Sequence, residues 1–251
     1  MTQERSGRLV ILSGPSCVGK SSLYKALVRF YPELTKAMQP LVLYNSRAPR
    51  PGESDGVDYY FRTRQQIEAL KAADRFVVMD VRGDLQALDM DELSVQLSKG
   101  DLLFEGNPFV GRTLQTYPHL AKVTKLSVFM SPLSREEIIF LKAPERNVSL
   151  SDLVTDVMRR KLLRRTRRQK AELSLKDLDN IERRASSAYQ ELKEAHHFEY
   201  ILPNHDGEDS ENWDAFYYPL GDARKVLLAF MSLLKGKGPS GVEQWEQNLI
   251  P

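Results

Sequence analysis

The chain has 251 residues, of which 41% are hydrophobic and 28% are charged, a globular balance that excludes a disordered or fibrous protein. Its 36 Lys and Arg stand against 34 Asp and Glu, so the net charge of +2 implies no global attraction to nucleic acid or to an anionic membrane. The single cysteine excludes an internal disulfide, and no apolar run approaches the roughly 20 residues of a membrane span. The start of the chain has no signal-peptide pattern, so we expect a cytoplasmic protein without membrane contact.

Regular structure is predicted to begin with a strand, a glycine loop and a helix. Leu9–Leu12 is a continuous apolar run, which is typical of a strand buried on both faces. Apolar residues after Lys20 recur at helical spacing until Pro32 ends the pattern. Further runs of the strand type lie at 41–43, 76–78, 102–104, 126–129 and 200–202. Helix-like segments lie at 64–72, 89–99, 134–142, 151–171, 178–195 and 222–234.

This alternation of short strands and helices predicts an α/β fold with a mainly parallel central sheet, organised as a single domain over 1–251. Residues 44–63 are rich in Arg, Pro, Gly and aromatics, which indicates a small excursion from the core. The segment 203–222 is predicted to be a polar loop, with its acidic part at 208–214 on the solvated surface. The tail at 236–251 has little periodicity and is expected to be loosely attached.

The glycine loop carries the first functional motif. Gly14–Ser21 matches G-x-x-x-x-G-K-S at every fixed position, between the predicted strand and helix. Backbone N–H groups of such a loop and the helix N-terminus converge on phosphate oxygens. Lys20 is expected to reach the β- and γ-phosphates, and Ser21 to bind Mg²⁺. The predicted nucleotide-binding residues are Gly14, Pro15, Ser16, Cys17, Val18, Gly19, Lys20, Ser21 and Ser22.

A phosphate loop is shared by ATPases, GTPases and kinases, so a second site must distinguish them. The Asn-Lys-x-Asp segment with which GTPases read guanine does not occur in the sequence. Arg47 and Arg50 lie three residues apart around a stiff Ala-Pro and before a Pro-Gly turn, so they can be held as a pair that matches a phosphate group. Tyr59 adds a hydroxyl donor. Taken alone, this segment fits a proline-stiffened surface loop equally well.

Together the two motifs resemble the guanylate kinase family. That family carries a phosphate loop followed by a segment of the form T-R-x-P-R-P-G-E-x-D-G-x-D-Y-x-F. Residues 47–61 match it almost continuously, and Ser46 stands in place of the usual Thr. Patches at 128–137, 184–201 and 203–206 extend the resemblance to roughly residues 8–235, with insertions near 140–180 and 207–220.

The resemblance implies a P-loop nucleotide kinase core with a parallel sheet at about 8–43, 96–139 and 186–235, an acceptor-binding lobe at about 44–95, and an arginine-rich lid at about 140–185. It implies phosphoryl transfer from ATP, with Mg²⁺, to a nucleoside monophosphate, GMP being the first candidate. The acceptor phosphate would be held by Arg47, Arg50 and Tyr59, the adenine would lie beside Asn204, and the metal would be bound through Ser21 and Glu105. The implied catalytic residues are Lys20, Arg47, Arg164, Arg168 and Arg184.

The three lid arginines are chosen by spacing from a strongly basic region. Eight of the twelve residues at 159–170 are Lys or Arg, and Leu162 and Leu163 form the one apolar strip. A solvated helix face and an RNA or polyphosphate contact are alternatives to a lid. The position of the segment between a Ser-Pro turn and Arg184 favours a lid whose arginines neutralise the transferring phosphoryl group.

The positions that read guanine in the family differ in this sequence. Leu43 replaces a hydroxyl, Phe76–Val78 lacks the family's Glu, and the segments at 83–88 and 105–109 also diverge. Asp80 or Asp84 is a candidate substitute carboxylate, although a role as a surface or turn acid is the simpler interpretation of each. The phosphate-binding parts are therefore present while most of the base-binding parts are not.

Three functional hypotheses remain open at this point. The first is a guanylate kinase, and the second is a similar enzyme with another phosphorylated acceptor. The third is a non-catalytic interaction module, against which the intact loop argues, because a scaffold has no use for Lys20. The sequence indicates no oligomeric state.

Overall fold

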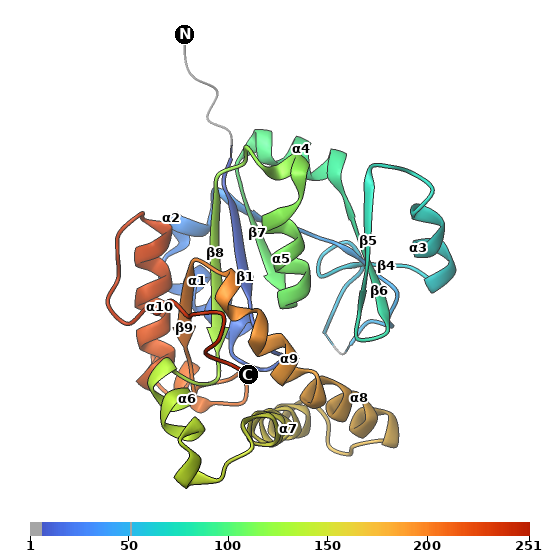
Figure 1. Cartoon of the computed structure of the whole chain (residues 1–251). Coiled ribbons are helices and arrows are strands. Elements are labelled where there is room, and N and C mark those ends of the chain that lie inside the picture. Colours follow the sequence, from blue (N-terminus) through green and yellow to red (C-terminus); the bar gives the residue numbers. More distant parts are fainter. Residues whose placement is uncertain (1–6, 51) are drawn as a thin grey trace.

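The computed structural model describes residues 7–50 and 52–251; Pro51, in the predicted Pro-Gly turn, lies outside them. Its main sheet has five parallel strands in the order β2-β7-β1-β8-β9 (Figure 1). The strands are β1 (Leu9–Ser13), β2 (Met38–Pro40), β7 (Asp101–Gly106), β8 (Lys125–Ser131) and β9 (Tyr200–Pro203). An α/β fold with a parallel sheet is thus confirmed.

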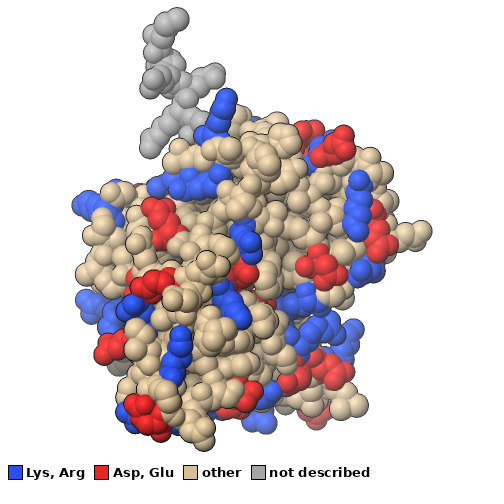
Figure 2. Space-filling model, viewed as in Figure 1, with Lys and Arg blue, Asp and Glu red and all other residues tan. Residues whose placement is uncertain are grey.

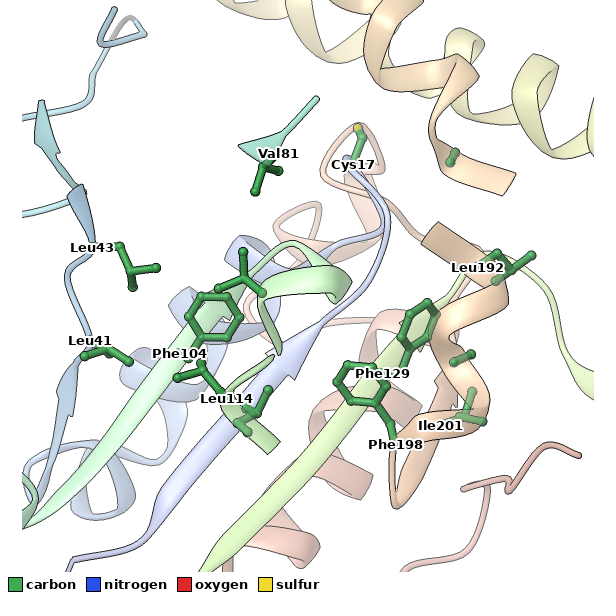
Figure 3. Close-up of a cluster of buried hydrophobic side chains, with 14 of the residues drawn as sticks. Cys17, Leu41, Leu43, Val81, Phe104, Leu114, Phe129, Leu192, Phe198 and Ile201 are labelled. Carbon is green, nitrogen blue, oxygen red and sulfur yellow. The ribbon is translucent and has the colours of Figure 1, made fainter. Parts of the chain in front are cut away.

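Helices cover both faces of this sheet. Leu9 and Ile11 of β1 point into one hydrophobic cluster and Val10 and Leu12 into another, as the two-residue period of a strand requires. The second cluster is closed by α1 (Lys20–Phe30) and α10 (Gly221–Leu234). The first is closed by α4 (Met90–Lys99), α5 (Pro108–Thr116), α7 (Leu150–Gln169), α8 (Leu175–Ser186) and α9 (Ala188–Lys193). Figure 3 shows Phe129 and Phe198 packed side by side in the first cluster.

The predicted excursion after residue 43 is a separate lobe with its own four-stranded sheet, in the order β4-β3-β6-β5 (Figure 1). Its elements are β3 (Tyr44–Asn45), β4 (Tyr60–Phe61), α3 (Arg64–Leu70), β5 (Phe76–Val81) and β6 (Asp84–Asp89). Thr63 caps α3 in a capping box with Gln66, which explains where this helix begins. A small core of Ile67, Leu85 and Ala87 holds the lobe together.

The region predicted at about 140–185, which contains the basic segment at 159–170, forms a helical arm below the main sheet (Figure 1). It begins after α6 (Arg135–Lys142) and consists mainly of α7 and α8. Ser134, Ser149 and Ser174 cap the three helices in turn. The single helix predicted at 178–195 is wrong: α8 ends at Ser186, α9 follows, and a 3₁₀ turn occupies Glu194–His197.

The position of one predicted strand is also wrong. The strand expected at 41–43 lies at Met38–Pro40, where β2 pairs with β7. Leu41 and Leu43 are apolar because they are buried under the main cluster, beside Phe104, where the chain passes into the lobe (Figure 3). The apolar run at 41–43 therefore indicates burial in the core and not pairing in a sheet.

The tail from residue 236 is docked on the body and not loosely attached. Trp245, Leu249 and Ile250 are buried in the main cluster. Glu243 exchanges two backbone hydrogen bonds of 2.9 Å with Ile201 on the edge of β9. The three apolar side chains are too few to give a sustained periodic pattern, so the sequence did not reveal this contact. Of the helices in the described residues, none is both long and apolar enough to cross a bilayer.

The loop at 203–222 is partly packed against the body: Glu211 and Asp214 are exposed as predicted, whereas Asp209 is buried, contrary to the predicted solvated surface. Asp209 is 6% exposed and Trp213 8% exposed. His205 clamps the loop, because its Nδ1 lies 2.6 Å from Asp222 Oδ2 and its Nε2 lies 2.9 Å from Glu137 Oε1. The loop is thereby tied to α6 and to α10.

We expect this clamp to make stability depend on pH. Burial lowers the pKa of His205, but the hydrogen bond to Asp222 and the charge of Glu137 outweigh it and raise the pKa above 6.5. The stabilisation is therefore complete below about pH 6.5 and is lost as the pH rises through the raised pKa. It amounts to at most about 1 kcal/mol, because the ring is half exposed.

The measurement is the free energy of unfolding in urea, compared between the unmodified chain and His205→Gln from about pH 6 to about pH 9. The difference between the two should shrink as the pH rises. His119→Gln is the matched control, because His119 has no carboxylate partner in the described chain. A difference that is constant or grows with pH contradicts the clamp.

Candidate active site

The phosphate loop has the backbone geometry that its sequence predicts. Gly14 has a φ of 149° and Gly19 a φ of 107°, both in the region that favours glycine. A Cβ on Gly14 would lie 2.4 Å from the Met130 carbonyl oxygen, so only glycine fits there. Helix α1 begins at Lys20 and points its N-terminus at the loop. The loop therefore presents converging N–H groups to an anion.

Lys20 is held inside this loop. Its Nζ donates hydrogen bonds of 2.8 Å to the carbonyl oxygens of Gly14 and Pro15. Burial lowers the pKa of Lys20. The ammonium is thus poised to exchange carbonyl partners for phosphate oxygens, which carry full negative charge and bind it more strongly.

Ser21 and Glu105, the two residues of the predicted metal site, lie in contact. The Ser21 hydroxyl donates a 2.6 Å hydrogen bond to Glu105 Oε1 at the carboxyl end of β7. Burial raises the pKa of Glu105, while the hydrogen bond from Ser21 opposes this. Both groups are oxygen donors, which suits Mg²⁺. No three His, Cys, Asp or Glu side chains gather as a metal site within 7–50 and 52–251, so phosphate oxygens would have to complete the coordination.

The arginine pair lies in the acceptor lobe at the other side of the cleft. Arg47 forms a bidentate ion pair with Glu53, at 2.6 and 2.7 Å, and its guanidinium lies over the rings of Tyr59 and Phe61. Burial and the nearby Arg47 lower the pKa of Arg50 to about 10, so it stays protonated near neutrality. Burial raises the pKa of Tyr59, which keeps its hydroxyl a donor. The three predicted acceptor residues thus lie together and offer two guanidinium groups and a hydroxyl donor.

The lid arginines are only partly those predicted. Arg184 is 8% exposed and its Nε donates a 3.1 Å hydrogen bond to Ser16 Oγ of the phosphate loop. Arg164 and Arg168 instead pair with acids of the 203–222 loop and do not line the cleft. Arg165 and Arg183 line it in their place. Arg165 follows Leu162 by one helical turn, so it lies on the side of the helix that the buried Leu162 turns toward the body.

The phosphate loop, the arginine pair and Arg184 all line one cleft of about 540 Å³. Its cationic lining residues are Lys20, Lys25, Arg47, Arg50, Arg82, Arg165, Arg183 and Arg184, and its acids are Glu53, Asp58, Asp84, Glu105 and Glu208. Figure 2 shows Lys and Arg gathered where the acceptor lobe faces the lid helices. Burial and the neighbouring Arg50, Arg165 and Arg82 lower the pKa of Arg184. A ligand that carries several negative charges would offset the repulsion between these cations.

Two carboxamides line the cleft near the arginine pair, where the sequence lacks the family's Glu. Asn45 and Gln86 are paired residues on β3 and β6, and both line the cleft. Asn45 Oδ1 accepts from the Arg47 N–H, while no partner within the described residues engages its Nδ2 or the Gln86 side chain. Leu43 is 2% exposed inside the main cluster, so it reads no ligand.

The remaining candidates for reading a base differ in whether they line the cleft. Val77 packs on the same cluster as Leu43 and is not part of the cleft lining. Asp80 accepts a 2.8 Å hydrogen bond from Gly83 N, so it is a turn acid. Asp84 lines the cleft and is the substitute carboxylate that remains.

Four predicted nucleotide-binding residues have other roles in the structure. Asn204 is fully buried, and its amide donates 2.7 Å hydrogen bonds to the carbonyls of Val18 and Asp206, so it fastens the 203–222 loop to the phosphate loop and does not face the cleft. Val18 itself is buried in the second cluster. Cys17 lines the cleft, but burial raises the pKa of its thiol, which makes it unreactive. Pro15 contributes its carbonyl to Lys20.

Glu208 is a site residue that the sequence did not reveal. It lines the cleft from the inserted loop, and its Oε2 is buried without a hydrogen-bond partner in the described part of the chain. Burial favours the neutral acid, but Arg165, Lys20 and Arg184 outweigh burial and lower the pKa of Glu208. The site therefore contains an ionised carboxylate beside the phosphate loop. Insertions have no pattern from which such a role can be read.

We expect Glu208→Gln to tighten binding of the donor nucleotide. The KM for ATP should fall about fivefold, which corresponds to about 1 kcal/mol of charge repulsion removed. Thermal stability without ligand should fall, because Arg165 and Arg184 lose a neighbouring anion, and ATP should raise it by more than in the unmodified chain. Glu172→Gln, on the exposed turn after α7, is the control. A raised KM for ATP would instead make Glu208 a group that assists the donor.

A phosphate loop that faces an arginine pair across one cleft, on a parallel α/β core, defines a phosphotransferase with a P-loop kinase fold. A sequence profile described as "Guanylate kinase" matches residues 6–83. The guanylate kinase of Synechococcus sp. (strain JA-3-3Ab) is 32% identical over 217 residues, covering 85% of this chain and 83% of that protein. The guanylate kinase of Koribacter versatilis is 30% identical over 226 residues, covering 89% and 79%.

A crystal structure of guanylate kinase from Anaplasma phagocytophilum shares the fold, with a TM-score of 0.51 and 17% identity over 92% of this chain and 86% of that one. The extent of the two sequence matches is decisive. The chain belongs to the guanylate kinase family.

Proposed function

We propose that this protein transfers the γ-phosphoryl group of ATP to a nucleoside monophosphate, with GMP as the first candidate acceptor. The observation that carries the proposal is the placement of Lys20 and the pair Arg47 and Arg50 in one cleft. Two phosphate-binding groups in one cleft suit a donor and an acceptor that both carry phosphate. The names of the relatives, all guanylate kinases, support the choice of GMP.

The residues of the chain contribute by positioning and by charge. Arg47, Arg50 and Tyr59 orient the acceptor phosphate, whose oxygens are already anionic near neutral pH, so no general base is needed. Lys20 binds the β- and γ-phosphates, and Arg184 neutralises charge that spreads over the transferring group. Arg165 and Arg183 contribute further positive charge from the lid.

Mg²⁺ is the cofactor that the family and the donor atoms favour. Ser21 would bind the ion directly and Glu105 would orient its water ligands, because the two side chains already share a hydrogen bond. When bound, the ion neutralises phosphate charge and fixes the geometry of the β- and γ-phosphates.

A second candidate is a related kinase whose acceptor carries another base. It is favoured by Asn45 and Gln86, since a carboxamide offers a donor and an acceptor together and suits bases that present both. A site built on hydrogen bonds to one base rejects others strongly, so the two candidates differ in measurable selectivity.

The test is a coupled ADP-release assay with GMP, dGMP, AMP, UMP, CMP and dTMP. The proposal expects transfer to at least one monophosphate, with GMP leading for a guanylate kinase and another base leading for the second candidate. Calorimetry with ATP runs in parallel. If ATP binds and none of the six is phosphorylated, the chain is not a kinase of these monophosphates.

A further inference from the structure

The tip of the β5–β6 hairpin carries an ion pair that the phosphoryl-transfer scheme does not use. Arg82 and Gly83 form the turn, with φ values of 59° and 84°. Two successive positive φ values are the geometry of a tight primed hairpin turn. Asn or Gly is usual at the first position, and an arginine there is unfavourable. The contacts of the Arg82 side chain offset the cost of this backbone conformation.

Arg82 reaches out of the acceptor lobe into the body of the protein. Its Nε donates a 2.6 Å hydrogen bond to Oε1 of Glu191 on α9, and an Nη atom contacts the same oxygen. The Glu191 side chain is completely buried, while that of Arg82 is 16% exposed. A buried carboxylate of the body is thus neutralised by a cation from the lobe, 109 residues away in the chain.

Glu191 connects this contact to the end of β7, the strand that carries Glu105. Its Oε1 also accepts hydrogen bonds from Asn107 Nδ2 at 3.0 Å and from Ser187 Oγ at 2.9 Å. Asn107 caps α5 through its other side-chain atom and follows Glu105 by two residues. One carboxylate oxygen therefore joins the hairpin tip of the lobe to the strand end that carries the metal-site acid.

The contact also lies at the acceptor site. Arg82 lines the cleft together with Asp84 and Gln86, which stand on the strand that begins directly after the turn. The lobe has its own sheet and its own small core, and Val77, Val81 and Leu88 also pack it on the first hydrophobic cluster of the body. The hairpin tip on α9 is the polar part of the contact that holds the acceptor groups relative to Lys20.

We propose that Arg82 is a positioning residue: its ion pair with Glu191 docks the acceptor lobe on the body and sets the distance between the acceptor and the phosphate loop. This inference rests on the proposed kinase function. A displacement of about 1 Å at the reacting centre costs about 100-fold in rate, so a loosened lobe should be costly.

The central variant is Arg82→Met combined with Glu191→Leu, which removes both charges and leaves neither one buried alone. We expect kcat/KM for the acceptor to fall by about 30-fold or more, mostly in kcat, with the KM for ATP unchanged within about twofold. Arg82→Lys alone should retain part of the activity, because it keeps the charge but not the paired geometry. The matched control is Arg112→Met with Glu194→Leu, a pair within the body.

A distance measurement separates this inference from the proposed function. Spin labels on cysteines introduced at Ala72 in the lobe and Lys122 in the body, both exposed, report the docking without any nucleotide. The buried Cys17 does not compete for the label. The distance distribution should be narrow in the unmodified pair and broad in the double variant.

An unchanged distribution, or an unchanged kcat in the double variant, overturns the positioning role. If the unmodified chain phosphorylates no monophosphate yet the distribution still broadens, the docking stands and the kinase assignment fails.

Discussion

Replacing Lys20 with alanine is expected to lower phosphoryl transfer by about 10³-fold or more. Lys20 is the one side-chain cation within Gly14–Ser21, and its Nζ already faces the Gly14 and Pro15 carbonyls where the phosphates would lie. A preorganised charge in a site shielded from water is worth several kcal/mol to a transition state that carries charge on phosphate oxygens. Single-turnover rates with saturating ATP and acceptor give the comparison.

The fold should survive this substitution, because burial of an ammonium is itself unfavourable and lowers the pKa of Lys20. A melting temperature close to that of the unmodified chain therefore accompanies the loss of rate. Lys36→Ala, at an exposed position, controls for general effects of removing a lysine. Turnover within about tenfold of normal in Lys20→Ala removes the phosphate loop from the mechanism.

The phosphate-binding half of the site could be predicted because it depends on contiguous residues. The loop at 14–21 and the segment at 47–61 each bring their own backbone geometry and charge, so local spacing predicts their chemistry. The α/β fold followed from buried strands that alternate with helices. What failed needed tertiary information: Leu41 and Leu43 resemble a strand but fill a core, and Asn204 resembles a ligand contact but fastens a loop.

The lid shows the same limit within a single helix. Arg164 and Arg165 are neighbours in a basic run, and their composition does not distinguish them. The packing of Leu162 turns Arg165 toward the cleft, while Asp209 draws Arg164 to the inserted loop at 2.7 Å. Arg82 and Glu191 meet across 109 residues without a local signal in either segment. Contacts between the lobe and the body were therefore beyond the reach of sequence patterns.

The second large effect is expected at Arg50. Arg50→Ala removes up to two charge-assisted hydrogen bonds to the acceptor phosphate, each worth about 1.5–3 kcal/mol. The expected loss in kcat/KM for the acceptor is therefore about 10²- to 10⁴-fold. Because the phosphate is common to every nucleoside monophosphate, the loss should be the same factor whichever base the acceptor carries.

Gln86→Leu supplies the contrast that makes the Arg50 result informative. Gln86 lines the same cleft but is neutral, so losing one of its hydrogen bonds costs about 0.5–1.5 kcal/mol, or roughly 2- to 13-fold. If Gln86 contacts the base, this smaller loss should differ between GMP, AMP and UMP, while the Arg50→Ala loss does not. An equal loss for all bases in Gln86→Leu would move Gln86 to the phosphate, and a base-dependent loss in Arg50→Ala would move Arg50 away from it. Either result would redraw the acceptor site around other polar residues of the cleft, among them Asn45 and Asp84.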